Sequence, residues 1–270
     1  MDTPLTPQRR TVPLLPELDM SLGGITLWGA SVAARATAFA VPELDVALDL
    51  GRLSPATAER SVVLLTHGHL DHLSGVLAYL NLRARFHAGE PTHLFGPPSV
   101  VDPLRQALAV MPGLESVRKR MRLDEVLLPA QPGQRVPLPR GWAVAFELDH
   151  GVPGLGWRVF QPEAQRPALV YGGDSATTVY ERDLDLLDAT IALVECTFVE
   201  PNRRVAARLS GHAHVLDWLE LAPRLRCDHL VLAHLPALPW VELVALTAPL
   251  AEVLPGRLVL WTESEPPSAD

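Results

Sequence analysis

The sequence predicts an α/β protein, and three observations carry that prediction. Short apolar, β-branched runs typical of buried strands recur between residues 25 and 261. In the second half of the chain these runs alternate with helical patterns, as in folds that cover a sheet with helices. No Gly- and Ser-rich linker divides the 270 residues, of which 48% are hydrophobic, so we expect one domain over residues 1–270.

The first half of the chain is expected to be rich in strands. Residues 1–20 are rich in proline and weakly patterned, so we expect an N-terminal extension that covers a surface. Residues 61–85 predict an apolar strand, a turn and a helix in succession. A second helix over residues 103–110 should stop near Pro112 and Gly113. The other strands of this half are expected at residues 25–28, 46–50, 92–96, 125–128, 134–138 and 142–148.

The second half is expected to alternate strands and helices. It should begin with a hairpin that pairs residues 159–160 with residues 168–171. Helical patterns follow at residues 180–187, 214–222 and 240–253. Apolar strands are expected between and after these helices, at residues 190–195, 229–233 and 257–261. Residues 264–270 are expected to form a C-terminal tail.

Charge and cysteine content exclude several classes of protein. The formal net charge of −8 argues against a protein that coats nucleic acid nonspecifically, although a local cationic site is compatible with it. The two cysteines, Cys196 and Cys227, provide neither a disulfide framework nor zinc-ribbon spacing. No apolar signal segment or run of about 20 apolar residues is present, so we expect a cytoplasmic protein that makes no membrane contact.

The densest chemical signal is residues 66–72, Thr-His-Gly-His-Leu-Asp-His, which follow the strand expected from residue 61. Four metal-ligand side chains fall within six positions: His67, His69, Asp71 and His72. His67 and His69 are two apart, so in an extended loop both rings point to one side. Asp71 and His72 open the following helix. Two pairs of ligands at one turn suit two adjacent metal ions better than one, because a single zinc site needs only three or four ligands.

Three further candidate ligands lie at or near the ends of expected strands. His150 follows the strand at 142–148, Asp174 follows an apolar strand and two glycines, and His234 ends an apolar strand. Taken singly, a histidine at a strand end is more often an ordinary polar residue, and Gly-Gly-Asp is usually a turn or a helix cap. Taken together after the 66–72 motif, the three complete one coordination set, which favours the metal-site interpretation.

The order of these blocks resembles the metallo-β-lactamase superfamily, and the later blocks are similar to ribonuclease Z. Residues 66–72 resemble the signature of the superfamily, and Leu232-Ala233-His234 resembles its last metal histidine. The blocks that are similar to ribonuclease Z are His150–Arg158, Tyr171–Ser175, Glu195–Phe198 and Gly211–His214. The match covers roughly residues 24–262, with all motifs in order.

This resemblance implies a four-layer αβ/βα sandwich with metals at one edge of two packed sheets. It implies two zinc ions, with manganese or iron as alternatives. One ion would be held by His67, His69, His150 and Asp174. The other would be held by Asp71, His72, Asp174 and His234, so that Asp174 bridges the two.

The resemblance also implies the catalytic groups. A hydroxide that bridges the metals would attack a phosphodiester, and Asp71 would orient this hydroxide. Glu195 and His212 would act as the acid–base pair. The expected substrates are therefore RNA, including the 3′ end of tRNA precursors, or a small phosphodiester. A homodimer is expected only because relatives form one.

One departure from ribonuclease Z weakens the tRNA prediction. Enzymes of that family with a tRNA-gripping arm carry it between the third and fourth motifs, whereas here residues 161–167 predict a short turn. The alternative function is a metallohydrolase for a cyclic nucleotide, lactone, ester or thioester with the same metal site. Two smaller alternatives stay open. His214 is either a helix start or part of the site, and the basic run at residues 118–122 is either a solvated face or an RNA contact.

Overall fold

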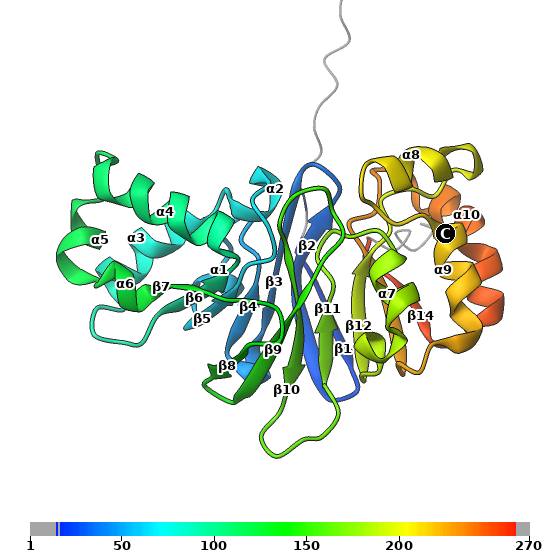
Figure 1. Cartoon of the computed structure of the whole chain (residues 1–270), viewed down its shortest axis with the longest axis horizontal. Helices are drawn as coiled ribbons and strands as arrows, with labels where there is room; N and C mark the ends of the chain where they lie inside the picture. The colour runs from blue at the N-terminus through cyan, green and yellow to red at the C-terminus, as the bar shows by residue number, and fades with distance from the viewer. Residues whose placement is uncertain (1–14, 16, 263–270) are drawn as a thin grey trace, which may run out of the picture.

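The computed structural model describes residue 15 and residues 17–262, which form two seven-stranded mixed sheets with helices on their outer faces (Figure 1). The strands of the first sheet are β1 (Leu18–Leu22), β2 (Ile25–Val32), β3 (Ala36–Val41), β4 (Val46–Leu48), β5 (Val62–Leu64), β6 (His93–Gly96) and β7 (Leu127–Pro129). The strands of the second sheet are β8 (Arg135–Leu138), β9 (Gly141–Glu147), β10 (Leu155–Phe160), β11 (Leu169–Tyr171), β12 (Ile191–Glu195), β13 (His229–Ala233) and β14 (Leu258–Leu260).

Both sheets follow the same plan. The first runs β1-β2-β3-β4-β5-β6-β7 and the second β14-β13-β12-β11-β10-β9-β8. Pairing is antiparallel from β1 to β4 and parallel from β4 to β7. It is likewise antiparallel from β8 to β11 and parallel from β11 to β14. The chain is therefore two similar halves, each of which turns from a meander into a parallel βα arrangement.

The helices cover the outer face of each sheet, which completes a four-layer αβ/βα sandwich (Figure 1). The first sheet is covered by the helices of the first half, α1 (Pro55–Ala58), α2 (Leu70–Leu73), α3 (Val76–Phe86), α4 (Pro98–Val110), α5 (Glu115–Arg120) and α6 (Leu123–Val126). The second sheet is covered by α7 (Thr178–Arg182), α8 (Arg204–Leu209), α9 (Val215–Leu221) and α10 (Trp240–Val253). The four short 3₁₀ segments are Pro42–Leu44, Leu184–Leu187, Pro201–Arg203 and Ala222–Arg224.

The largest apolar cluster lies between the two sheets and draws side chains from both. Phe39 of β3 makes edge-on ring contacts with Tyr171 of β11 and with Trp261 after β14. Trp157 of β10 is fully buried there, and its indole N–H donates to the carbonyl oxygen of Leu65 across the sheets at 3.2 Å. Removing a side chain of this size from water stabilises the fold by roughly 1.5–3 kcal/mol.

Several expected elements differ from those in the structure. Residues 18–20, expected in the extension, belong to β1, while residues 1–14, residue 16 and the tail at 264–270 lie outside the described residues. The strand expected at 125–128 begins as helix α6 and becomes β7 only at Leu127. The helix expected at 180–187 is split, because the Asp183 side chain accepts a bond from the Asp185 N–H and starts a separate 3₁₀ turn. Strand β3 and helices α1, α5 and α8 were not expected.

None of the helices in the described part of the chain combines the length and the apolar character that spanning a bilayer requires.

Candidate metal centre

The first group of candidate ligands lies where β5 ends. Strand β5 is buried in the parallel part of the first sheet, between β4 and β6. The chain leaves its carboxyl end into residues 66–69, and His69 occupies the position before the first residue of α2. His67 and His72 are buried, whereas His69 is exposed and Asp71 is half-buried. One strand-to-helix turn thus presents all four side chains of the 66–72 motif.

The second group comes from three strand ends of the second sheet. His150 follows β9, Asp174 follows β11 and His234 follows β13, and all three are buried. Gly173, just before Asp174, has φ +50°, and a Cβ there would lie 2.8 Å from the Thr66 side chain. Glycine is therefore required for the Asp174 loop to approach the 66–72 motif this closely.

The two groups meet, with Asp174 between them. The ring nitrogens of His67 and His150 each lie 3.1 Å from Nδ1 of His69. On the other side of Asp174, His72 Nε2 is 3.3 Å from its Oδ1, and His234 Nε2 is 3.4 Å from its Oδ2. Asp71 Oδ2 lies 3.3 Å from His234 Nε2. The seven donors of the sequence analysis therefore form one cluster built from both sheets.

Two atoms in this cluster indicate that the site fits a cation. His72 Nε2 and Asp174 Oδ1 are buried, lie 3.3 Å apart and have no hydrogen-bond partner. Burying polar atoms without a partner is costly, and each such atom in a native protein calls for an explanation. Imidazole nitrogen and carboxylate oxygen are the donor types that zinc takes, so a bound metal would satisfy both atoms.

Protonation in the cluster also suits metal binding. Burial, helped by the neighbouring His72, lowers the pKa of His67 to about 2, which keeps that imidazole neutral. Burial opposes ionisation of Asp174, but His72 and His234 outweigh it and hold the pKa of this carboxyl well below its usual range. Burial likewise opposes a proton on His72, yet the carboxylates of Asp174 and Asp49 raise its pKa well above the usual value. His67 is thus a neutral imidazole and Asp174 a carboxylate anion, while the His72 ring carries a proton that a bound cation would replace.

Glu195 and His212 lie directly beside the donors. Glu195, the last residue of β12, is buried, and its Oε1 lies 2.8 Å from His212 Nδ1. The Ser175 N–H donates to the same oxygen, and Thr197 donates to the other through its N–H and its hydroxyl. Burial opposes a charge on His212, but the hydrogen bond to Glu195 raises its pKa above the ordinary value. Glu195 therefore favours the protonated form of a histidine that faces the cluster.

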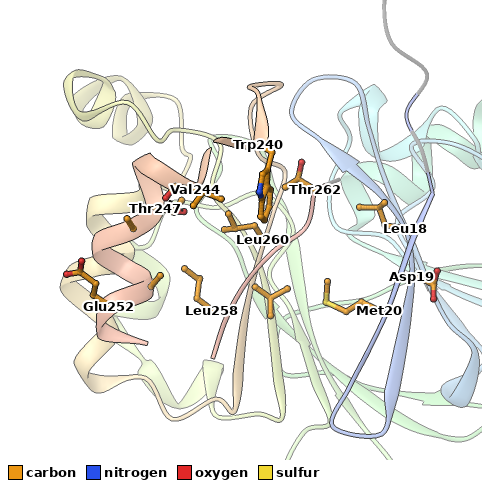
Figure 2. Close-up of a pocket in the computed structure, with 13 residues that line it drawn as sticks. Leu18, Asp19, Met20, Trp240, Val244, Thr247, Glu252, Leu258, Leu260 and Thr262 are labelled. Atoms are coloured by element: carbon orange, nitrogen blue, oxygen red, sulfur yellow. Dashed lines mark hydrogen bonds between the residues drawn. The ribbon is translucent and has the colours of Figure 1, made fainter. Parts of the chain in front are cut away.

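A cavity of about 490 Å³ opens onto these groups. Its walls include His69, Asp71, Asp174, His212 and His234, and Arg35 contributes from the turn between β2 and β3. A larger cavity of about 780 Å³ lies elsewhere, between α10 and the edge strands β1 and β14 (Figure 2). Its lining is mostly apolar, with Leu258 and Leu260 from β14, and the described residues that line it include no group of metal donors. The chemistry therefore belongs to the smaller, polar cavity.

Comparison with known proteins gives the family. A model described as a β-lactamase superfamily domain matches residues 40–235. The chain belongs to this superfamily. It is a metallo-β-lactamase hydrolase with a buried cluster of histidines and aspartates of the kind that binds metal in this fold.

Within the superfamily, the chain is distantly similar to ribonuclease Z. It is 24% identical over 255 residues to the chloroplastic tRNase Z TRZ2 of Arabidopsis thaliana, covering 83% of this chain and 71% of that protein. It is 22% identical over 277 residues to tRNase Z TRZ1 of the same plant, covering 90% and 97%. The short form of human tRNase Z has a similar fold, with a TM-score of 0.60, 18% identity and coverage of 79% and 93%. The metallo-β-lactamase fold protein YhfI from Bacillus subtilis gives a TM-score of 0.62 at 16% identity, with coverage of 85% and 92%.

One residue beside the cluster was not predicted from the sequence. Asp49, after β4, is fully buried and has φ +52°. Its Oδ2 lies 2.7 Å from His72 Nδ1 and accepts bonds from the hydroxyls of Thr66 and Tyr171, and its Oδ1 accepts from the Thr66 N–H. Asp49 therefore fixes the orientation of the His72 ring. Its position after an apolar strand was the available signal, but one aspartate there also fits an ordinary turn.

His214 and side chains of the basic run at residues 118–122 bond to neighbouring parts of the chain. His214 precedes α9, where its Nδ1 accepts from the Leu216 N–H and its Nε2 bonds the Glu200 carbonyl oxygen. It therefore caps a helix and lies outside the donor groups. In the basic run, Arg118 and Arg120 donate to backbone carbonyl oxygens and Arg122 pairs with Glu125.

The connection between β10 and β11 is short, as the sequence predicts. The two strands pair antiparallel, and the Ala168 N–H bonds the Val159 carbonyl oxygen to close the turn. No protruding arm is present among residues 150–174, all of which the structure describes.

Proposed function

We propose that this protein is a dinuclear metal-dependent phosphodiesterase that hydrolyses RNA, related in activity to ribonuclease Z. The observation that carries the proposal is the Glu195–His212 pair set against a buried His/Asp cluster. Cleavage of an RNA phosphodiester expels an alkoxide, which is a poor leaving group, and a proton donor beside the cluster would protonate it as it leaves. The similarity to proteins named tRNase Z supports the same substrate class.

The metal-holding residues follow from the two donor groups. His67, His69, His150 and Asp174 would hold one ion, and Asp71, His72, His234 and again Asp174 would hold the other. Zinc is the proposed metal because imidazoles dominate the donor set, with manganese or iron as alternatives. When bound, two such ions supply Lewis acidity toward the phosphoryl oxygen and lower the pKa of water.

The chain's own groups then position the substrate and move the proton. Arg35, on the wall of the cavity, offers a planar cation to a phosphate. Asp71, ionised because its bond to His234 outweighs burial, orients the attacking water. His212 carries the proton that the leaving oxygen receives, and Glu195 holds its ring through Nδ1 so that Nε2 is free for this transfer.

A small-molecule hydrolase is the second candidate. The cavity of about 490 Å³ is large enough for a nucleotide-sized ligand, and the β10–β11 turn provides no extended RNA-binding surface. A cyclic nucleotide would use the same proton donor. A thioester, which expels a stable thiolate, would leave His212 without an essential role.

A substrate panel run on metal-loaded protein tests the proposal. It comprises a tRNA precursor with a 3′ trailer, a single-stranded RNA, bis(p-nitrophenyl) phosphate, a cyclic nucleotide, a lactone and a thioester. We expect turnover of the RNA substrates and of bis(p-nitrophenyl) phosphate. Turnover of the lactone or thioester with no phosphodiester cleavage would overturn the proposal. Cleavage of the tRNA precursor at its 3′ end alone would narrow the substrate to tRNA.

A further inference from the structure

A cation and an aromatic ring lie beside His212, outside the groups assigned so far. Phe198 follows the Glu195 block, and its ring centroid is 6.1 Å from that of His212. The guanidinium carbon of Arg203 lies 5.3 Å from the centroid of the same Phe198 ring. Arg203, Phe198 and His212 therefore form a connected row that leads from the proton donor to the surface.

The backbone fixes Phe198 relative to His212. The Phe198 N–H donates to the Ala213 carbonyl oxygen at 3.3 Å, and its own carbonyl oxygen accepts from the Val215 N–H at 3.0 Å. These bonds form an isolated parallel bridge between Phe198 and His214. The ring is half-buried, so it is a rigid support with one part open to solvent.

Among the described residues, Arg203 differs from its neighbouring arginines in having no carboxylate partner. Arg204 pairs with Asp217 and Glu220, and Arg208 pairs with Asp217. Within the described residues, the exposed Arg203 side chain makes no ion pair and no hydrogen bond, and the Phe198 ring is its aromatic contact. In a chain of net charge −8, an arginine held on a ring and left without an anion is preorganised to bind one.

From this arrangement we infer that Arg203, supported by Phe198, binds the phosphate of the nucleotide that leaves over His212. The inference rests on the proposed function, because His212 must face the leaving oxygen for Arg203 to lie beside the leaving group. The inference also narrows the substrate class of the proposed function. The preferred substrate is a phosphodiester whose leaving group is itself a phosphorylated nucleotide, as within an RNA chain, and not an isolated diester.

A matched set of dinucleotides tests the inference. UpU has no second phosphate, whereas pUpU and UpUp each add one at a different end. We expect the wild-type protein to cleave one of the two phosphorylated forms more efficiently than UpU. In Arg203→Gln that preference, measured as the ratio of kcat/KM values, should fall about ten-fold, as expected for one lost charge-assisted contact.

Arg140→Gln is the matched control. Arg140 is an exposed arginine in the turn before β9, separated by the length of that strand from His150. Its substitution should leave the ratio unchanged. A ratio unaltered in Arg203→Gln, or an equal loss in both variants, would overturn the inference.

Binding keeps the inference separate from the proposed function. If the wild-type protein cleaves no phosphodiester at all, the proposed function fails, and affinity for a single-stranded RNA oligonucleotide is measured against salt instead. Loss of one phosphate contact in Arg203→Gln should weaken binding and reduce the salt slope by about one. Equal slopes in wild type and variant, or no RNA binding by either, would reject the role of Arg203.

Discussion

Asp174 is the residue on which the two donor groups depend most. It lies within 4.0 Å of His67, His72, His150 and His234, and it carries one of the two buried atoms without a hydrogen-bond partner. We predict that Asp174→Ala loses metal from both positions together with activity. Metal content by elemental analysis, compared with the exposed-residue control Asp124→Ala, measures this. A variant that still held two equivalents would show that Asp174 does not bridge.

His212 should separate metal binding from turnover. It bonds Glu195 and lies outside the two groups of ligands that we assign, so His212→Ala should keep its metal. Loss of a general acid should lower kcat by about 10²–10⁴-fold. Rate and metal content are measured on the same preparation, with RNA or bis(p-nitrophenyl) phosphate as substrate. Wild-type turnover in the variant would remove His212 from the mechanism.

At the residue scale, how much of the site can be predicted depends on how residues are grouped in sequence. Residues 66–72 are informative because four donors within six positions have no common structural explanation. His150, Asp174 and His234 become informative only as members of that set. Asp49 cannot be identified from the sequence, because its role comes from contacts with Thr66, His72 and Tyr171. Tyr171 lies 122 positions away in the sequence, on the other sheet.

At the scale of elements, the strands that carry the donors were the easiest to predict. Strands β5, β11 and β13 are short apolar runs in the buried parts of the sheets, and β9 is a longer, partly buried strand. Strand β3 was harder, because its sequence Ala-Thr-Ala-Phe-Ala-Val has little β-branched character and becomes a strand through full burial between β2 and β4. Residues 123–129 change from helix to strand at Leu127, a boundary that tertiary packing sets and local preference does not.

Helix α9 provides a prediction at this scale. Its N-terminus is capped by His214, whose ring accepts the Leu216 N–H at 3.0 Å. His214→Ala should lower the free energy of unfolding by about 1 kcal/mol, the usual cost of losing a cap. Asn, a good capping residue, should restore most of it. Denaturant unfolding measures the loss, and metal content should equal that of the wild type. Metal loss in His214→Ala with stability intact would instead return His214 to the metal site.

At the scale of the whole molecule, the fold class was predictable from the sequence. The way in which the two sheets pack against each other was only partly predictable. Alternating strands and helices indicated α/β, and the motif order implied the four-layer sandwich that the structure has. Periodicity carries no information on which faces of the two sheets meet. That is set by side chains such as Phe39, Trp157 and Trp261, which fill the space between the sheets.

Because the candidate ligands are divided between the two sheets, we predict that a bound metal stabilises the whole fold. The first sheet provides the donors of the 66–72 motif and the second provides His150, Asp174 and His234. Chelation should therefore lower the thermal midpoint, and added zinc should restore it. At free metal of about a thousand times Kd the stabilisation is about 4 kcal/mol. Scanning calorimetry with and without chelator measures this, and Asp174→Ala should show a much smaller difference. Identical midpoints in wild-type protein would contradict a site shared by the two sheets.

The same division has a consequence for synthesis. A polypeptide emerging from the ribosome exposes His67 long before His234, and the N-terminal portion begins to fold first. Until β13 docks, the coordination set lacks its final imidazole. The full set of candidate donors therefore assembles only after His234 has been synthesised and β13 has joined the second sheet.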